Sequence, residues 1–103
     1  MITYQVLCTV PEDIEQEWRD WMLEEHIRDV MGTEMFTGYS LQRVVKPHPE
    51  RTVQYSIRYG AESWEKIEQY RADFAPVLQA AHNAKYGSSI TVERSILEDV
   101  AMR

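Results

Sequence analysis

The sequence predicts an α+β fold in which two helices cover one face of a four-stranded antiparallel sheet. Three observations predict this fold. Residues 2–10 and 53–59 alternate between apolar and polar side chains, which is typical of half-buried strands. Residues 12–31 and 63–86 carry apolar side chains at helical spacing. Apolar segments at 35–46 and 90–100 complete the order β-α-β-β-α-β, and 103 residues fit one domain, residues 1–103.

The first strand has an apolar face and a polar face. Its apolar face carries Ile2, Tyr4, Val6, Cys8 and Val10. Pro11 ends the strand, and Glu12 and Asp13 suit the first turn of a helix because carboxylates favour the positive end of the helix dipole. Gly32 is a suitable stop for this helix.

The segment between the second and third strands contains Pro47 and Pro49. Because proline has no amide hydrogen to donate within a sheet, this segment is predicted to be a turn. The flanking strands, 35–46 and 53–59, are therefore expected to form a hairpin.

The second helix has candidate residues for its start, its bend and its end. Ser63 is a candidate N-cap, Pro76 is expected to kink or restart the helix, and Gly87 is expected to close it. The candidate inward residues of the fourth strand are Ile90, Val92, Ile96 and Val100. With right-handed crossovers, the order of elements gives a ferredoxin-like sandwich with both helices on one face.

Composition and charge exclude several classes of partner. The chain has 11 basic and 17 acidic residues, a net charge of −6, and no basic run. Neither nucleic acid nor an anionic membrane surface is expected as a partner, since both require a basic face. No apolar stretch approaches the roughly 18 residues that span a bilayer, and no signal peptide is recognised, so a cytoplasmic location is expected. The single cysteine, Cys8, is expected to be a buried, inert thiol.

The predicted sheet face opposite the helices is polar but mostly uncharged. In the first and third strands it carries Thr3, Gln5, Leu7, Thr9, Gln54, Ser56 and Arg58. A solvated sheet face usually has more Lys and Glu, whereas Thr, Ser and Gln suit a hydrated contact between sheets. The sequence therefore predicts a homodimer through this face, with two sheets stacked into a barrel. The alternative is a solvent-exposed face.

The first helix changes character along its length. At 100° per residue, Trp18, Met22, Glu25 and Asp29 form one stripe, with His26 at its edge. One interpretation is a polar pocket at the C-terminal end of the helix, with His26, Glu25 and Asp29 as acid–base candidates. The other is that the helix tilts away from the sheet and these groups are solvated, which is favoured for Glu25 because buried carboxylates are rare.

The aromatic residues are candidates for lining an apolar cavity between the helices and the sheet. The expected lining residues are Trp18, Met22, Tyr70, Phe74 and His82, and the alternative is that the aromatic side chains are simply core. Tyr55 and Tyr59 are candidates for polarising a substrate carbonyl. His26, His82 and Asp29 would also suit a transition metal, but their spacing does not require one, so no metal or cofactor is predicted.

Matching segments extend over nearly the whole chain: residues 17–22, 26–31, 55–59, 61–63, 74–78 and 86–87, with Tyr70 and His82. Together they resemble a short bacterial family of unknown function in the dimeric α/β-barrel (ferredoxin-like) superfamily. Arg28 departs from the pattern, since relatives commonly have proline there. The resemblance implies the fold and a dimer but no activity. Haem-degrading members of the superfamily use an asparagine on the first strand, which Ile2–Val10 lacks.

The sequence supports two functional hypotheses. The first is an uncharacterised small homodimer that binds a small apolar or aromatic ligand between helices and sheet. The alternative is a cofactor-independent monooxygenase or isomerase acting on an aromatic or quinone-like substrate. In that case His26 is the acid–base group, Asp29 orients it, and Tyr55 or Tyr59 polarises the carbonyl. A cavity of about 300 Å³ beside His26 and Tyr55 would favour the alternative.

Overall fold

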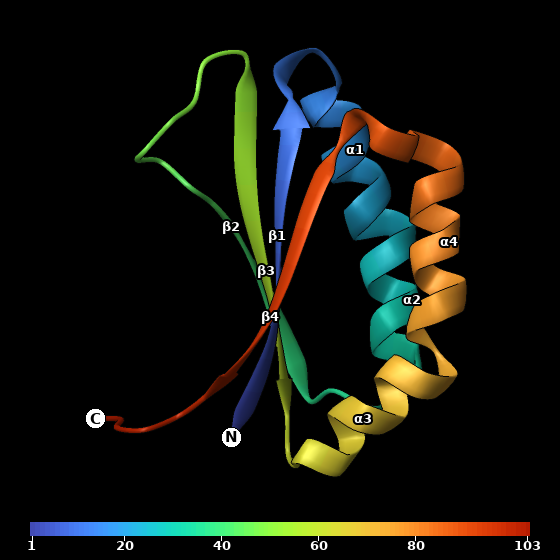
Figure 1. Cartoon of the computed structure of the whole chain (residues 1–103), viewed down its shortest axis with the longest axis vertical. Helices are drawn as coiled ribbons and strands as arrows, with labels where there is room; N and C mark the ends of the chain where they lie inside the picture. Colours follow the sequence, from blue (N-terminus) through green and yellow to red (C-terminus); the bar gives the residue numbers. More distant parts are fainter.

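Four strands form one antiparallel sheet in the order β2-β3-β1-β4. They are β1 (Ile2–Pro11), β2 (Gly38–Arg43), β3 (Thr52–Ala61) and β4 (Thr91–Glu98). The computed structural model describes residues 1–103 and places every helix on one face of this sheet (Figure 1). The predicted α+β, ferredoxin-like topology is confirmed.

The first helical segment contains four successive pieces. They are the 3-10 turn η1 (Glu12–Ile14), the α-helix α1 (Glu15–Trp21), the π-helical turn η2 (Met22–His26) and the α-helix α2 (Ile27–Gly32). The segment corresponds to the predicted helix at 12–31. The π turn was not predicted, because helical periodicity assumes a constant 100° per residue.

The π turn changes which side chains face the sheet. In η2 the amide of Ile27 donates to the carbonyl of Met22, five residues earlier, so this turn holds one extra residue. The inward stripe consequently moves from Glu25 and Asp29, which are exposed, to His26 and Val30. Because of the π turn, the side of the helix that faces the sheet carries a histidine and a valine instead of two carboxylates.

The second helical segment is divided into α3 (Trp64–Asp73) and α4 (Ala75–Tyr86), followed by the 3-10 turn η3 (Gly87–Ser89). The Ser63 hydroxyl caps α3 by accepting from the amide of Lys66, as predicted. The break falls at Phe74, and Pro76 stands in the first turn of α4, so of the two expected outcomes the helix restarts rather than kinks. Proline suits the first turn of a helix because the amides there have no intrahelical acceptor.

The core lies between the sheet and the helices. The register pairs Tyr4 with Tyr59 and Cys8 with Tyr55, so aromatic and apolar side chains of β1 and β3 share the covered face. Trp18 and Ile27 from the first helical segment and Ile67 from α3 are fully buried against them. Most of the aromatic residues are therefore core, as one of the two alternatives held.

Two predicted strands are shorter than expected. β2 begins at Gly38 rather than residue 35, and the segment before it places Phe36 in the core. β4 ends at Glu98 because that residue pairs with Ile2, the first residue of β1. Val100, predicted to face inward, has no strand to pair with and is 92% exposed. None of the helices has the length and hydropathy that a membrane crossing needs.

Candidate functional site

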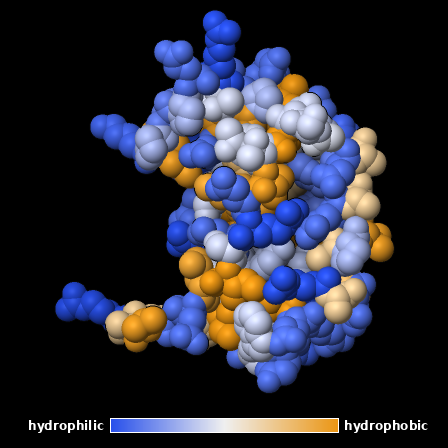
Figure 2. All heavy atoms as spheres, viewed as in Figure 1, coloured by the Kyte–Doolittle hydropathy of each residue, from blue (hydrophilic) through white to orange (hydrophobic).

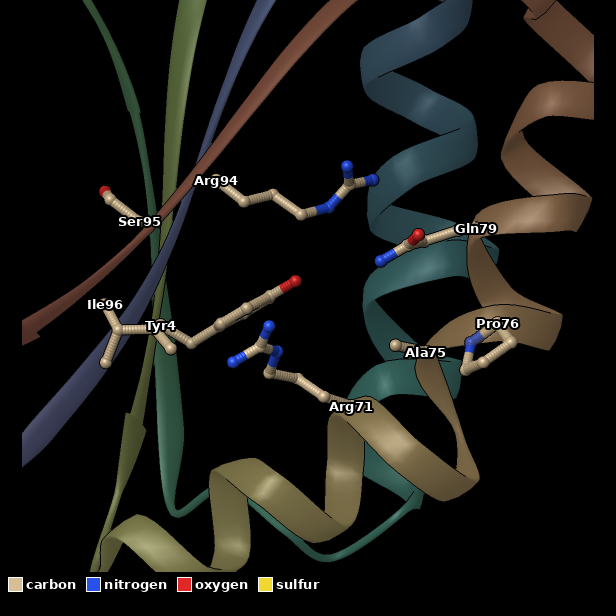
Figure 3. A pocket seen from close by; sticks show the side chains of 8 residues that line it. All are labelled: Tyr4, Arg71, Ala75, Pro76, Gln79, Arg94, Ser95 and Ile96. Carbon is tan, nitrogen blue, oxygen red and sulfur yellow. The ribbon is translucent and has the colours of Figure 1, made fainter.

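A pocket of about 350 Å³ opens between the sheet and the helices α3 and α4 (Figure 3). It is lined by Tyr4 of β1, by Arg94, Ser95 and Ile96 of β4, by Arg71 of α3, and by Ala75, Pro76 and Gln79 of α4. Figure 2 shows hydrophilic side chains lying across apolar ones in the region between the two layers. The volume is at the lower end of the range for small-molecule sites.

Two smaller cavities of about 30 Å³ each adjoin this pocket on its inner side. Gln79 and Arg94 line all three spaces, and Met22 and His26 line both of the inner ones. One inner cavity also contacts Tyr59 and Tyr70, and the other contacts His82. Each inner cavity has room for about one water molecule, and His26 lines both of them.

The hydroxyl end of Tyr4 is the centre of the pocket. The side chain extends from the sheet toward the helices, with the guanidinium groups of Arg94 and Arg71 on either side and the Gln79 amide opposite (Figure 3). Burial raises the pKa of Tyr4, and the positive charges of Arg94 and Arg71 partly oppose that rise. Three donor-bearing side chains from three elements thus converge around one phenol.

Neither arginine of the pocket has a carboxylate partner. The ion pairs of the chain join Met1 to Asp99, and Arg19 and Arg43 to Glu15, all away from the pocket. No acidic residue lines the pocket itself. Although the chain has a net charge of −6, this site is locally positive.

Arg94 was not among the residues singled out from the sequence. The register pairs it with Val6, and its neighbours in the same row, Val92 and Ile96, pair with Cys8 and Tyr4. Arg94 therefore occupies an inward position of β4, and its side chain extends from the sheet toward the helices with its charged end in the pocket (Figure 3). The inward position of Arg94 could have been read from the sequence. The alternation in residues 90–96 places Arg94 in the same row as the apolar residues Ile90, Val92 and Ile96.

His26 and His82 lie close together behind the pocket, with their ring centres 5.8 Å apart. Burial lowers the pKa of His26 to about 4, and the charges of His82 and Arg94 act in the same direction, while Asp29 opposes them. Burial, and then the charge of Arg94, also lower the pKa of His82. Both imidazoles are consequently neutral near pH 7, so each has one nitrogen that accepts a hydrogen bond.

The Trp18 indole N–H donates to Nε2 of His82 over 3.1 Å. Trp21 lies beside both rings, with its ring centre 5.4 Å from that of His26 and 5.9 Å from that of His82. Aromatic side chains therefore enclose the histidine pair on the side away from the pocket.

The four candidates for catalysis do not converge. His26 and Tyr59 line the inner cavities, whereas Asp29 is exposed and lines a separate groove of about 450 Å³. Asp29 forms no ion pair with His26. Tyr55 lies elsewhere, where its hydroxyl donates to Glu15 and accepts from Arg19 and Arg43. No pocket of 300 Å³ lies beside both His26 and Tyr55.

The five residues predicted to line one pocket lie in three different places. Met22, Tyr70 and His82 line the inner cavities. Phe74 lines the separate groove with Asp29, and Trp18 is fully buried behind His82. No group of three or more His, Cys, Asp or Glu side chains is arranged to hold a metal ion.

Comparisons with known proteins address the family and the fold. A family model described as "Domain of unknown function (DUF4286)" matches residues 1–100. A search of curated proteins finds no match.

Three of the similar solved structures are nearly as long as this chain. A mutant of MhuD, with two manganese protoporphyrin IX molecules bound per active site, has a TM-score of 0.72 at 18% identity, covering 100% of this chain and 98% of its own. An ethyl tert-butyl ether D (EthD) family protein from Bacillus halodurans has a TM-score of 0.69 at 16% identity, covering 97% and 100%. A dimeric ferredoxin-like protein from an uncultured marine organism has a TM-score of 0.69 at 15% identity, covering 99% and 97%. These likenesses show the ferredoxin-like fold.

Proposed function

For this chain, which belongs to the DUF4286 family of unknown function, we propose that it binds a small molecule in the pocket between the sheet and α3 and α4. The observation that carries the proposal is the pocket of about 350 Å³ with four polar side chains converging in it. A concave site with a few convergent polar groups is the usual form of a small-molecule site. The porphyrins bound by MhuD support the use of this fold for such binding.

The shape of the site favours a ligand with an apolar or aromatic body. The Tyr4 ring, Ile96, Ala75 and Pro76 supply apolar surface around the pocket. The inner cavities, at about 30 Å³ each, are too small to admit a ring, so the body of the ligand stays in the outer pocket. We place the protein in a bacterial cytoplasm, where the buried Cys8 thiol stays reduced.

A thermal-shift screen with single-ring phenols, quinones and aryl acids tests binding. We expect at least one class to raise the Tm of the wild type, because a ligand that binds only the folded state stabilises it. Gln79 lines all three spaces, so Gln79→Phe should abolish the shift. The matched control is Gln69→Phe, at an exposed position of α3, which should bind as the wild type does. Absence of any shift, or normal binding by Gln79→Phe, contradicts the proposal.

We also propose that the chain forms a homodimer through the uncovered face of the sheet. The register places on that face only two charged side chains, Arg58 and Glu93. The Gln5 side chain there donates to Ser95 and accepts from Ser56 and Arg58, which ties three strands together. The dimeric ferredoxin-like protein of similar fold supports this arrangement.

Light scattering at low micromolar concentration tests the dimer. Leu7 is half-buried in the centre strand of this face, so Leu7→Lys should produce a monomer by bringing like charges together across the interface. Leu23→Lys, at an exposed position on the helical layer, is the control and should remain dimeric. A monomeric wild type would contradict the proposal.

A second candidate function, a cofactor-independent monooxygenase or isomerase, is favoured by one observation. His26 is neutral near pH 7 and lines two inner cavities with room for a water molecule, so a water molecule there can pass it a proton. Oxygen uptake with 1,4-dihydroxynaphthalene tests this candidate. Turnover by the wild type and by His48→Gln, but not by His26→Gln, supports it, and equal rates in all three contradict it.

A further inference from the structure

Two guanidinium groups lie on either side of the Tyr4 hydroxyl in a pocket that no acidic side chain lines (Figure 3). Arg94 extends from the sheet and Arg71 from α3, and both lie beside the hydroxyl of Tyr4 (Figure 3). On the basis of the binding function proposed above, we propose that the ligand is an organic acid whose carboxylate lies between Arg71 and Arg94 and whose apolar body packs on the walls of the pocket.

Electrostatics favours an anion at this point. Two positive charges in one concave site repel each other, and the pocket offers no acidic residue to balance them. A concave surface of one sign also concentrates ions of the opposite sign. Because the chain as a whole is acidic, its net charge does not attract anions. This pocket is a local exception at which an anion is attracted.

The donor set suits a carboxylate attached to an organic body. Guanidinium groups match the planar geometry of a carboxylate and bind it through paired hydrogen bonds. The Gln79 amide and the Tyr4 hydroxyl provide further donors beside them. The apolar side chains around these groups, Ile96, Ala75 and Pro76, offer nothing to a free inorganic anion but pack well against a ring.

Carboxylate binding should also change the pKa values of the histidines behind the pocket. Arg94 is one of the charges that lower the pKa of His26 and His82. A carboxylate paired with Arg94 offsets that charge, so binding should raise the pKa of His26. The titratable and charged groups facing His26 are Tyr4 and Cys8 of β1, Asp29 of α2, Tyr59 of β3, Tyr70 of α3, His82 of α4 and Arg94 of β4. Of these, the ligand contacts Tyr4 and Arg94 in this proposal, and only Arg94 carries a charge that the carboxylate offsets.

Calorimetric titration with matched acids and amides tests the inference. The probes are benzoate, phenylacetate and 2-naphthoate, each compared with its neutral amide, and inorganic phosphate. We expect at least one acid to bind about tenfold or more tightly than its amide, because hydrogen bonds to charged groups are worth more than neutral ones. Arg94→Gln and Arg71→Gln should each weaken acid binding about tenfold, and Arg71→Lys should restore part of it.

Two controls keep the outcome interpretable. Arg103→Gln removes the same charge at the exposed C-terminus, far from the helices, and should leave binding unchanged (Figure 1). Arg71 is exposed, so Arg71→Gln still provides the test if the inward Arg94→Gln fails to fold. In proton NMR titrations the pKa of His26 should rise when the bound acid is present and stay constant with the amide.

The results separate the inference from the function on which it rests. If acids and amides bind equally well, the carboxylate inference is wrong and small-molecule binding stands. If phosphate binds as tightly as the acids, an organic acid is not the ligand class. If none of these probes binds, the carboxylate inference is wrong, and small-molecule binding falls as well when the phenols and quinones of the thermal-shift screen also fail to bind.

Discussion

The indole N–H of Trp18 on α1 donates a hydrogen bond to Nε2 of His82 on α4, across 3.1 Å of the protein interior. Trp18 is fully buried and His82 is 7% exposed. Because Nε2 accepts this bond, its lone pair is occupied and the neutral imidazole carries its hydrogen on Nδ1. The contact therefore joins two helices and fixes the neutral form of a histidine beside the candidate site.

Replacing Trp18 with Phe should destabilise the protein by about 2–4 kcal/mol, since it leaves a cavity and an unpaired buried acceptor. Urea unfolding at pH 7.5 measures this change, with Trp64→Phe, at a 43% exposed position, as the control. Freed of the Trp18 donor, Nε2 of His82 can bind a proton, so the pKa of His82 should rise in an NMR titration. A variant as stable as the wild type would show that the bond contributes nothing.

The buried histidines should make the protein sensitive to acid. The pKa of His26 is about 4 in the folded chain and 6.5 as an ordinary value, so between these the unfolded chain binds a proton that the folded chain excludes. Stability should therefore fall as the pH drops from about 6.5 to about 4, by up to about 3 kcal/mol, with His82 contributing in the same direction.

Urea unfolding at fixed protein concentration between pH 7.5 and pH 4 measures this dependence. His26→Gln, which has no titrating ring, should have a flatter profile, and His48→Gln in the exposed turn should match the wild type. Equal slopes for the wild type and His26→Gln would contradict the assignment.

The Tyr55 hydroxyl should matter for stability rather than for binding. It donates to Glu15 at the start of α1 and accepts from Arg43 at the end of β2 and from Arg19, so it ties the first helix to the sheet. Tyr55→Phe should cost about 1–2 kcal/mol, whereas Tyr39→Phe, at an exposed hydroxyl, should cost less than about 0.5. Ligand affinity should be unchanged in both, and a loss of affinity in Tyr55→Phe would place this hydroxyl in the site.

Cys8 should be chemically silent in the folded protein. Its side chain is 1% exposed, and burial raises the pKa of the thiol to about 12. Since the thiolate is the reactive form, labelling by an aromatic disulfide reagent at pH 8 should be about a thousandfold slower than in guanidinium chloride. Rapid stoichiometric labelling of the native protein would contradict this expectation.

Much of the fold could be predicted from local patterns. Alternation in β1 and β3 gave the correct covered and uncovered faces, because a strand has a fixed period of two. Ser63 and Gly87 marked helix ends through well-defined capping chemistry. The ends of β2 and β4 were less well predicted, because a strand ends where its neighbouring strand ends. That point depends on the pairing register and not on the composition of the strand itself.

The candidate site was predictable only in part. His26, Met22, Tyr59, Tyr70 and His82 were named from the sequence and lie around the inner cavities. Tyr55 and Asp29 were named with them and lie elsewhere, while Arg94 and Arg71, which line the outer pocket, were not named from the sequence.

The sequence by itself determined the order of elements and the two faces of the sheet, since both follow from periods that each segment carries alone. Tertiary structure decided which side chains meet. One extra residue in the π turn moved His26 inward and left Asp29 in solvent. Pairing of β4 with β1 brought Arg94 beside Tyr4, and packing of α3 on the sheet brought Arg71 to the same place. These side-chain contacts depend on strand register and on the rotation of each helix about its axis. Both are fixed by contacts between segments rather than within them.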